Sequence, residues 1–188
     1  MMQKVQHTPL LFKTYQLTTG QASLTRHFFK PAFFLLVVFS LLTTALQAQW
    51  VKTGQDIDGE AANDNSGSAV SMSSDGSTVA IGAIYNSNLN GNLSGHVRVY
   101  KLVSGVWTQQ GGDIDGEASG DQSGYSVSLS SDGSIVAIGA YQNDGNGNEA
   151  GQVRVYKLIS GVWTQQGSDI DGEASNDFSG RSVSLSSD

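Results

Sequence analysis

The sequence contains no cysteine, so disulfide bonds do not contribute to its stability in any compartment. Segments with the 3.6-residue periodicity of an amphipathic helix are absent from the repeated part of the chain. Histidine is also scarce: of three histidines, only His96 lies outside the first 48 residues. A single histidine excludes a repeated histidine metal site and argues against a Ser-His-Asp catalytic arrangement. We therefore expect a protein that is not an enzyme.

Residues 1–48 contain no acidic residue, and the first acidic residue of the chain is Asp56. A basic segment with Lys4, Lys13, Arg26 and Lys30 precedes the apolar run 32–42, which ends near Ala45-Leu46-Gln47-Ala48. This order is typical of a secretory signal peptide, with cleavage after about Ala48. The competing interpretation is a membrane anchor, but the apolar run is shorter than the ~20 residues of a spanning helix. We expect a secreted or cell-surface protein without membrane insertion after cleavage.

Removal of this leader makes the chain strongly acidic. The whole sequence carries a net charge of −7, whereas the part after residue 48 carries 6 − 17 = −11. Nucleic acid and anionic membrane surfaces are poor partners for such a surface. Cations and neutral polymers such as glycans are compatible with it.

The rest of the chain, residues 49–188, is an internal repeat. Trp50, Trp107 and Trp163 are 57 and 56 positions apart and mark units 50–106, 107–162 and an incomplete unit 163–188. Each tryptophan is expected to contribute strongly to stability, and Trp107 would do so by packing between repeats. Variation between units falls on Asn65, Gln122 and Phe178, on Ser68, Tyr125 and Arg181, and on an Asn-rich loop, which makes these positions candidate ligand contacts.

One unit predicts four strands. Residues 125–130 alternate apolar and polar side chains, Asp132-Gly133 predicts a hairpin turn, and residues 135–140 are apolar as in a central strand. Residues 153–158 and 162–165 complete the set. We therefore predict an all-β partial β-propeller with four-stranded antiparallel blades: two full repeats and a truncated third, after the signal peptide. Because a closed propeller needs at least four blades, further blades are expected from missing sequence or from another chain.

The recurring pattern SG-x-SVSLSSDGS-x-VAIGA, followed by G-x-VRVYK and G-x-WTQ-x-G, resembles the FG-GAP repeat of integrin-α-like propellers in secreted bacterial proteins. The resemblance covers residues 50–188, with Phe178-Ser179-Gly180 in place of the aromatic-glycine pair, although neither Gly82-Ala83 nor Gly139-Ala140 is followed by proline. It implies an exported, non-enzymatic module for adhesion or binding of an unknown protein or glycan ligand. The alternative is the propeller part of a secreted polysaccharide-active hydrolase or lyase whose catalytic residues lie elsewhere.

No cofactor is required by the sequence, but calcium is the one ion to consider. The family's blades carry a calcium loop of the type D-x-D-x-D-G, and here the Ser-Ser-Asp-Gly-Ser turn has one carboxylate, too few for the six to eight oxygens that calcium prefers. The other candidate ligands are acidic residues repeated in each unit: Asp56, Asp58, Glu60, Asp64; Asp113, Asp115, Glu117, Asp121; and Asp169, Asp171, Glu173, Asp177.

In an extended backbone the first three carboxylates of each acidic set would point the same way, and a cation could offset their repulsion. The preferred interpretation is a turn in which Asp and Ser side chains hold backbone amides between blades. Residues 143–149 match half of a calcium loop, and a flexible Asn/Gly turn is preferred there too. His96 corresponds to Gln152 in the next unit and is expected to face solvent from a strand.

Overall fold

The computed structural model describes residues 49–186, and the predicted signal peptide lies outside them. By its contacts, the chain divides into a unit that ends at Trp50 and a unit that begins at Val51 and contains all of the strands. Every element of regular structure in residues 49–186 is a β-strand. Within that range, no helix has the length and apolarity needed to cross a membrane.

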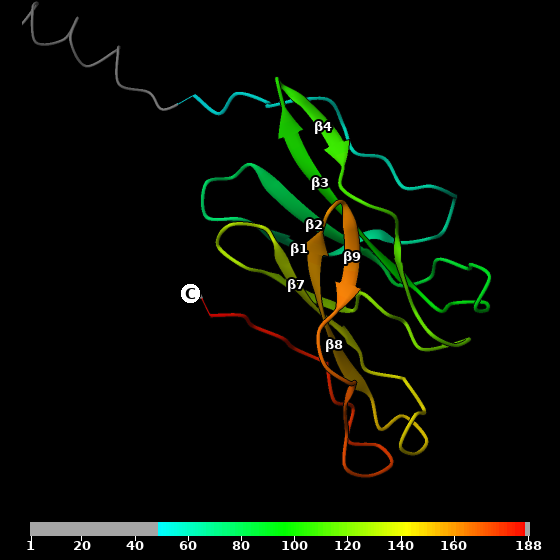
Figure 1. Ribbon diagram of the computed structural model, residues 1–188. Coiled ribbons are helices and arrows are strands. Elements are labelled where there is room, and N and C mark those ends of the chain that lie inside the picture. The colour runs from blue at the N-terminus through cyan, green and yellow to red at the C-terminus, as the bar shows by residue number, and fades with distance from the viewer. Residues whose placement is uncertain (1–48, 187–188) are drawn as a thin grey trace, which may run out of the picture. The chain divides into compact units, whose positions relative to one another are not determined.

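Ten strands form two antiparallel sheets, which we call the first and second blades (Figure 1). The first blade contains β1 (Ser66–Met72), β2 (Thr78–Ala83), β3 (His96–Val103), β4 (Val106–Gln109) and β5 (Ile114–Asp115). The second contains β6 (Ser126–Leu129), β7 (Ile135–Ala140), β8 (Gln152–Ile159), β9 (Val162–Gln165) and β10 (Ile170–Asp171). The predicted all-β class and its four strands per unit are confirmed.

Each blade is a meander whose outer strand is interrupted. In the first blade β4 pairs with the end of β3 at Leu102↔Trp107, and β5 pairs with the start of β3 at Val97↔Ile114. The two short strands therefore share one partner, and the chain leaves the sheet between them. The second blade repeats this arrangement with β9 and β10 along β8. A blade thus takes its outer strand from beyond the tryptophan that marks the next sequence unit.

The hydrophobic core lies between the faces of the two blades. The first blade contributes the buried side chains of Ala80, Val97, Val99 and Ile114, and the second contributes Leu129, Val136, Ile138 and Tyr156. Along β3 the buried valines alternate with His96 and Arg98, and along β7 Val136 and Ile138 alternate with smaller residues, so each of these strands directs one apolar row toward the other blade. Such stacking of meander sheets is the architecture of a partial β-propeller.

The blades approach closely at glycine. A Cβ atom on Gly82 of β2 would collide with the carbonyl oxygen of Gly124, so only glycine fits there. Hydrogen bonds join the same faces: Leu129 N donates to Ser71 Oγ at 2.9 Å, and Ser74 N donates to Ser131 O at 2.9 Å. These close contacts explain why the first residue of the Gly-Ala motif is glycine.

The third repeat starts to cover the second blade in the same way. Leu185 N donates to Ser128 Oγ at 3.0 Å, and Ser126 Oγ donates to Gly180 O at 2.7 Å. Gly139, the equivalent of Gly82, would collide with Gly180 if it carried a side chain. The stacking rule is therefore repeated along the chain.

The tryptophans lie on the outer strands, and the expectation that Trp107 packs between blades is wrong. Trp107 and Trp163 are half-buried on β4 and β9, and their indole nitrogens donate to Thr53 O at 3.1 Å and Gln110 O at 2.7 Å. Trp163 also contacts the core cluster. Trp50 is 99% exposed. Trp107 and Trp163 thus attach the incoming linkers to the outer edges of the two blades.

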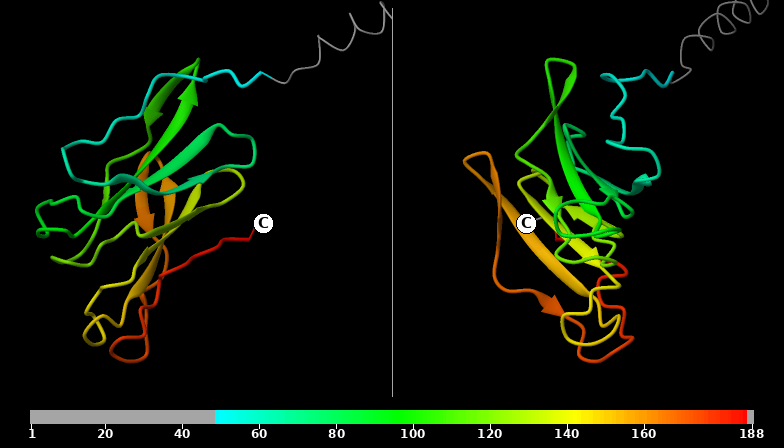
Figure 2. Two further views of the ribbon diagram at one scale, coloured as in Figure 1. Left: turned by 180° about the vertical axis from the view of Figure 1, so that it is seen from behind. Right: turned by 90° about the vertical axis from the view of Figure 1, so that its right-hand side faces the viewer.

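The loops between the second and third strands project from the same side of the two blades (Figure 2). In the first blade this loop covers residues 84–95, and in the second it covers residues 141–151. Each loop meets the linker that leads to the following blade: Ser119 Oγ donates to Asn92 O at 2.8 Å, and Asn146 Nδ2 donates to Gly172 O at 2.7 Å. This side of the blades therefore collects the segments that vary most between repeats.

Candidate binding surface

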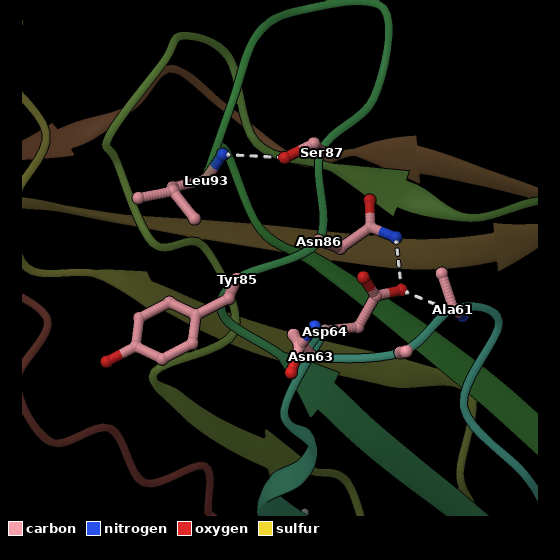
Figure 3. Close-up of a pocket in the computed structure, with 8 residues that line it drawn as sticks. Ala61, Asn63, Asp64, Tyr85, Asn86, Ser87 and Leu93 are labelled. Carbon is pink, nitrogen blue, oxygen red and sulfur yellow. Dashed lines mark hydrogen bonds between the residues drawn. The ribbon is translucent and has the colours of Figure 1, made fainter.

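Each full blade carries a pocket beside a buried aspartate, which lines the pocket in the first blade and is absent from the lining in the second. In the first blade Asp64 Oδ2 accepts hydrogen bonds from Ala61 N at 3.2 Å and from Asn86 Nδ2 at 2.9 Å (Figure 3). The aspartate caps the turn before β1, and the asparagine begins the loop after β2. Both side chains are buried, with exposed fractions of 7% for Asp64 and 6% for Asn86. This pair joins two loops that are distant in sequence.

The second blade uses the same pair. Asp121 Oδ2 accepts from Ala118 N at 2.9 Å and from Asn143 Nδ2 at 3.0 Å. Burial raises the pKa of Asp121, and donation by Asn143 and by the Ala118 amide partly opposes that rise. In the third repeat Asp177 Oδ2 accepts from Ala174 N at 2.8 Å. Asp64, Asp121 and Asp177 therefore have the turn role that was the preferred interpretation of their sequence position.

The two pockets differ in what lines them. The first has a volume of about 500 Å³ and is lined by Ala61, Ala62, Asn63, Asp64, Tyr85, Asn86, Ser87 and Leu93 (Figure 3). The second has a volume of about 250 Å³ and is lined by Ser119, Gly120, Gln142, Asp144, Asn148 and Glu149. Tyr85 is replaced by Gln142 and Leu93 by Glu149 at equivalent positions. An apolar, aromatic wall in one repeat is thus polar in the next.

Two lining side chains stand on backbone that favours glycine. Leu93 has a φ of 55° and Glu149 a φ of 50°, in the left-handed region that is uncommon for residues with a Cβ atom. The local hydrogen bonds explain how the chain holds this shape: Leu93 N donates to Ser87 Oγ at 3.1 Å, and Glu149 N donates to Asp144 Oδ1 at 2.7 Å. Residues 143–149 are thus a hydrogen-bonded turn, in which Asp144 is occupied by its own loop.

Three aromatic rings lie side by side between the second blade and the third repeat. The ring centroids of Tyr125 and Tyr141 are 4.2 Å apart, and those of Tyr141 and Phe178 are 6.2 Å apart. Desolvation raises the pKa of Tyr141, and the neighbouring Tyr125 and Tyr85 raise it further. Gln122 accepts a hydrogen bond from Tyr141 and donates one to Gln142. We call Tyr125, Tyr141 and Phe178 the aromatic row.

The structure thus brings together three of the positions that vary between repeats, Gln122, Tyr125 and Phe178. Sequence reasoning missed Tyr85 and Tyr141, which link these positions to the pockets. The signal was present: an aromatic residue follows the central strand in both full repeats, shifted by one position.

The acidic residues within one linker do not converge on one point. Asp56 pairs with Lys52 at 2.7 Å, the carbonyl oxygen of Asp58 accepts from Arg98 Nη2 at 2.7 Å, and Glu60 lies 3.6 Å from Arg98 Nη1. In the second linker the Asp115 carbonyl accepts from Arg154 Nη2 at 2.8 Å, and Glu117 lies 3.4 Å from Arg154 Nη1. Each linker therefore attaches to the arginine of the blade that follows it.

The expectation that Asp113, Asp115 and Glu117 point the same way is wrong. Asp113 Oδ1 accepts from Gln109 Nε2 at 2.7 Å, and Asp115 Oδ1 accepts from Asn88 Nδ2 at 2.9 Å. Glu117 instead accepts from Gln152 Nε2 at 3.0 Å, beyond the end of β5. Gly116 follows the end of β5 and packs against the Ser94 backbone, where a Cβ atom would collide with Ser94 O.

His96 is buried, with 1% of its surface exposed, so the expectation of a solvent-facing residue is wrong. The first linker covers it, and its Nδ1 lies 3.8 Å from Glu60 Oε2 and 4.0 Å from Asp113 Oδ2. Among the described residues these three form the only group of potential metal ligands from histidine, cysteine and carboxylates within mutual reach. Glu60 and His96 belong to the first repeat and Asp113 to the second, which is why inspection of one acidic set did not find them.

The hairpin turns are fully occupied by their own side chains. Asp132 Oδ1 accepts from Ser130 Oγ at 2.7 Å and from Ser134 N at 2.9 Å, and Oδ2 accepts from Ser134 Oγ at 2.9 Å. Donation by Ser130 and Ser134 lowers the pKa of Asp132 to about 2. Asp75 has the same partners in Ser73 and Ser77 and a pKa of about 2. These turns are structural elements with no ligand position left over.

With this geometry in hand, comparison with known proteins identifies the repeat: residues 114–156, from β5 into β8, match the FG-GAP repeat family. This segment of the second repeat is similar to an FG-GAP repeat. The match lies within residues 50–188, where the sequence resembles this repeat, and it covers the second pocket, Asp121 and Arg154. No curated protein matches the chain.

Among solved structures, the periplasmic gluconolactonase PpgL of Pseudomonas aeruginosa is similar to part of the chain at 19% identity and a TM-score of 0.36. The similarity covers 52% of this chain and 26% of that protein, so this chain spans about a quarter of it. A TM-score at that level does not establish a shared fold, and the activity named for PpgL is a property of that protein.

Proposed function

We propose that the chain is an exported, non-enzymatic β-propeller module that acts at the cell surface and binds a neutral glycan at its loop pockets and aromatic row. The observation that carries the proposal is the contrast between the two pockets. Equivalent Asp–Asn pairs join the loops at both pockets, whereas the side chains that line the pockets differ in size, polarity and charge. A constant scaffold with exchangeable loop residues is typical of a binding surface.

The chemistry of this surface favours a glycan over a polyanion. Tyr85 and Leu93 offer partly exposed apolar surface, with 43% of each residue accessible. Gln142 and Glu149 provide planar polar groups beside the aromatic row, joined by a 3.3 Å hydrogen bond. Aromatic rings bury apolar faces while amides and carboxylates orient hydroxyl groups, the combination used in most small-ligand sites. The charge of −11 after residue 48 disfavours nucleic acid and acidic polymers.

The test is binding of the full chain, produced with its export signal, to a panel of neutral polysaccharides and to extracellular matrix proteins. Tyr85→Ser should weaken glycan binding at least about tenfold, because it removes an exposed ring from the first pocket. Leu89→Ser is the matched control: it lies in the same loop, is fully exposed at 105% and does not line the pocket. Equal melting temperatures would show that both variants are folded.

Three outcomes would contradict the proposal. Binding that Tyr85→Ser and Leu89→Ser weaken equally would remove the pocket from the interface. Preference for a protein ligand would replace the glycan. Release of shorter sugars from a bound polysaccharide would identify a hydrolase or lyase. Export is tested separately, since the protein recovered outside the cytoplasm should begin near Gln49.

A further inference from the structure

The buried imidazole of His96 lies under the first linker with no hydrogen bond that satisfies it. Its side chain is 2% exposed, and Nε2 has no partner among the described residues. On the other side of the ring, Nδ1 is directed at Glu60 Oε2 and Asp113 Oδ2, at 3.8 Å and 4.0 Å. Both distances exceed the 2.7–3.2 Å of an N–H···O hydrogen bond. The ring is therefore aimed at two carboxylates that it does not reach.

The distances between these three side chains are close to those between the ligands of a metal ion. Zinc–nitrogen and zinc–oxygen bonds of about 2.0–2.2 Å place neighbouring ligand atoms about 3.4 Å apart in a tetrahedral site. The three candidate atoms all lie within 4.8 Å of one another, so their separations would shorten by up to about 1.4 Å when an ion binds. Glu60 and Asp113 are partly exposed, with side-chain fractions of 42% and 30%, which leaves room for water ligands and a path for the ion.

The equivalent place in the second blade shows what the site looks like without a metal ligand. Gln152 replaces His96 and is equally buried, at 1%. Its Nε2 donates to Glu117 Oε2 at 3.0 Å, so the amide closes the gap that the imidazole leaves open. The carboxylate that corresponds to Asp113 is Asp169, which makes the same 2.7 Å contact with the glutamine four residues before it. The fold therefore does not require histidine at this position.

We propose that Glu60, His96 and Asp113 form a binding site for a divalent transition-metal ion of the zinc type, with water completing its coordination. An imidazole nitrogen selects such metals over calcium, which prefers oxygen ligands only. Arg98 lies 3.6 Å from Glu60 Oε1, so the metal uses the other oxygen, Oε2. The ion joins the first linker to the outer strand of the first blade. This inference does not depend on the proposed glycan binding.

We expect a dissociation constant in the micromolar range. Metal-bound histidines usually donate their second ring nitrogen to an acceptor, and losing that partner typically weakens affinity 10–100-fold. His96 Nε2 has no such acceptor among the described residues.

The experiment is calorimetric titration of the full, untagged chain with Zn²⁺ and, separately, Ca²⁺. We expect about one Zn²⁺ ion bound per chain, a rise of several degrees in melting temperature at saturation, and no heat from Ca²⁺ up to millimolar concentration. His96→Gln, which installs the residue used by the second blade, should abolish Zn²⁺ binding while the chain still folds. His7 and His27 remain in that variant, so binding by the leader would survive the substitution.

A matched pair of carboxylate variants separates ligation from structure. Asp113→Asn should weaken Zn²⁺ binding at least about tenfold, because one charged ligand is lost. Asp169→Asn, which changes the equivalent residue of the second blade, should leave it unchanged. Absence of Zn²⁺ binding below about 100 μM, or binding that His96→Gln retains, would overturn the site. If Asp113→Asn and Asp169→Asn weakened Zn²⁺ binding equally, the effect would come from the overall negative charge of the chain. That result would also overturn the proposed site.

Discussion

Asp64 in the first blade and Asp121 in the second accept hydrogen bonds from equivalent partners, a turn amide and an asparagine. The residues that these frames present are different: Tyr85 and Leu93 in one pocket, Gln142 and Glu149 in the other. Frame atoms are buried and paired with backbone groups, so their loss would leave unsatisfied polar atoms. The side chains that line the pockets do not have to satisfy buried polar groups in this way, and this difference explains which positions vary between repeats.

The same contrast holds within the blades. Arg98 and Arg154 stack over Tyr100 and Tyr156, at 5.5 Å and 5.6 Å from the ring centroids, and each arginine anchors the linker that precedes its blade. Burial raises the pKa of both tyrosines, which stay neutral beside the arginine. Beside these constant pairs, His96 and Gln152 differ. The two blades should therefore behave alike at the arginine–tyrosine pairs and differently at His96 and Gln152.

The largest effect is expected where the blades touch. Gly82→Ala should lower the free energy of unfolding by at least about 3 kcal/mol, because the new methyl group meets backbone that cannot move aside. Gly112→Ala is the control, since a Cβ atom there meets nothing within 4 Å. Urea denaturation of both variants measures the difference. If Gly82→Ala were as stable as Gly112→Ala, the blades would not be packed face to face at this glycine.

The two outer-strand tryptophans should differ. Trp163 packs against the core cluster, so Trp163→Ala should cost about 2.5 kcal/mol, less than a fully buried tryptophan would. Trp107 contacts Gly54 and Leu102 at the edge of the first blade, and Trp107→Ala should cost about 1.5 kcal/mol. Thermal and urea unfolding give both values. The reverse order would mean that the edge of the first blade, not the core, depends on its tryptophan.

The strands could be predicted from the sequence because their information is local. Alternation in residues 125–130 and the Asp132-Gly133 turn determine a hairpin without reference to the rest of the chain. The repeat then supplies the other blade. The sequence also predicts the outer strand, but it places the second piece of that strand, Ile114–Asp115, in an acidic loop.

The site could not be predicted to the same extent because it depends on contacts between repeats. His96 alternates with buried valines and therefore resembles a solvent-facing residue, but linker residues such as Glu60 cover that face of β3. Asp113 reaches His96 only because β5 pairs beside it. Similarly, Tyr141 contacts Phe178 only when the third repeat packs on the second. Strand periodicity contains no information about such neighbours.

Substitution of the buried aspartates Asp64 and Asp121 should show how the two pockets differ in stability and in amide hydrogen exchange. Asp64→Ala and Asp121→Ala should each lose about 1.5–2 kcal/mol of stability, because a buried asparagine donor is left unpaired. Asn143 Oδ1 still accepts from Gly145 N at 2.8 Å, whereas Asn86 Oδ1 has no partner in the part of the chain that the structure describes. Asp64→Ala should therefore increase amide hydrogen exchange in loop 84–95 more than Asp121→Ala does in loop 141–151. Equal exchange would show that Gly145 adds nothing to the second frame.

The smallest effect is a difference in titration between two aspartates of the second repeat. Asp132, with a pKa lowered from 3.8 to about 2, stabilises the fold above about pH 3.8 and loses that contribution as pH falls through 2. Asp121 has the opposite sign: burial raises its pKa above 3.8, so its contribution is present below that pH and is lost as pH rises through the folded value. Carbon-13 NMR of the carboxyl groups measures both.

Ser130→Ala with Ser134→Ala should return the pKa of Asp132 toward 3.8, because the two hydroxyl donors are lost, while Asp75 in the unaltered first repeat stays at about 2. This internal reference makes the comparison independent of bulk acid unfolding. If Asp132 and Asp121 titrated together near 3.8, the hairpin turn and the pocket frame would impose no distinct electrostatic environments on their carboxylates. The distinction between the hydrogen-bonded hairpin turns and the pockets would then depend only on which residues line the pockets.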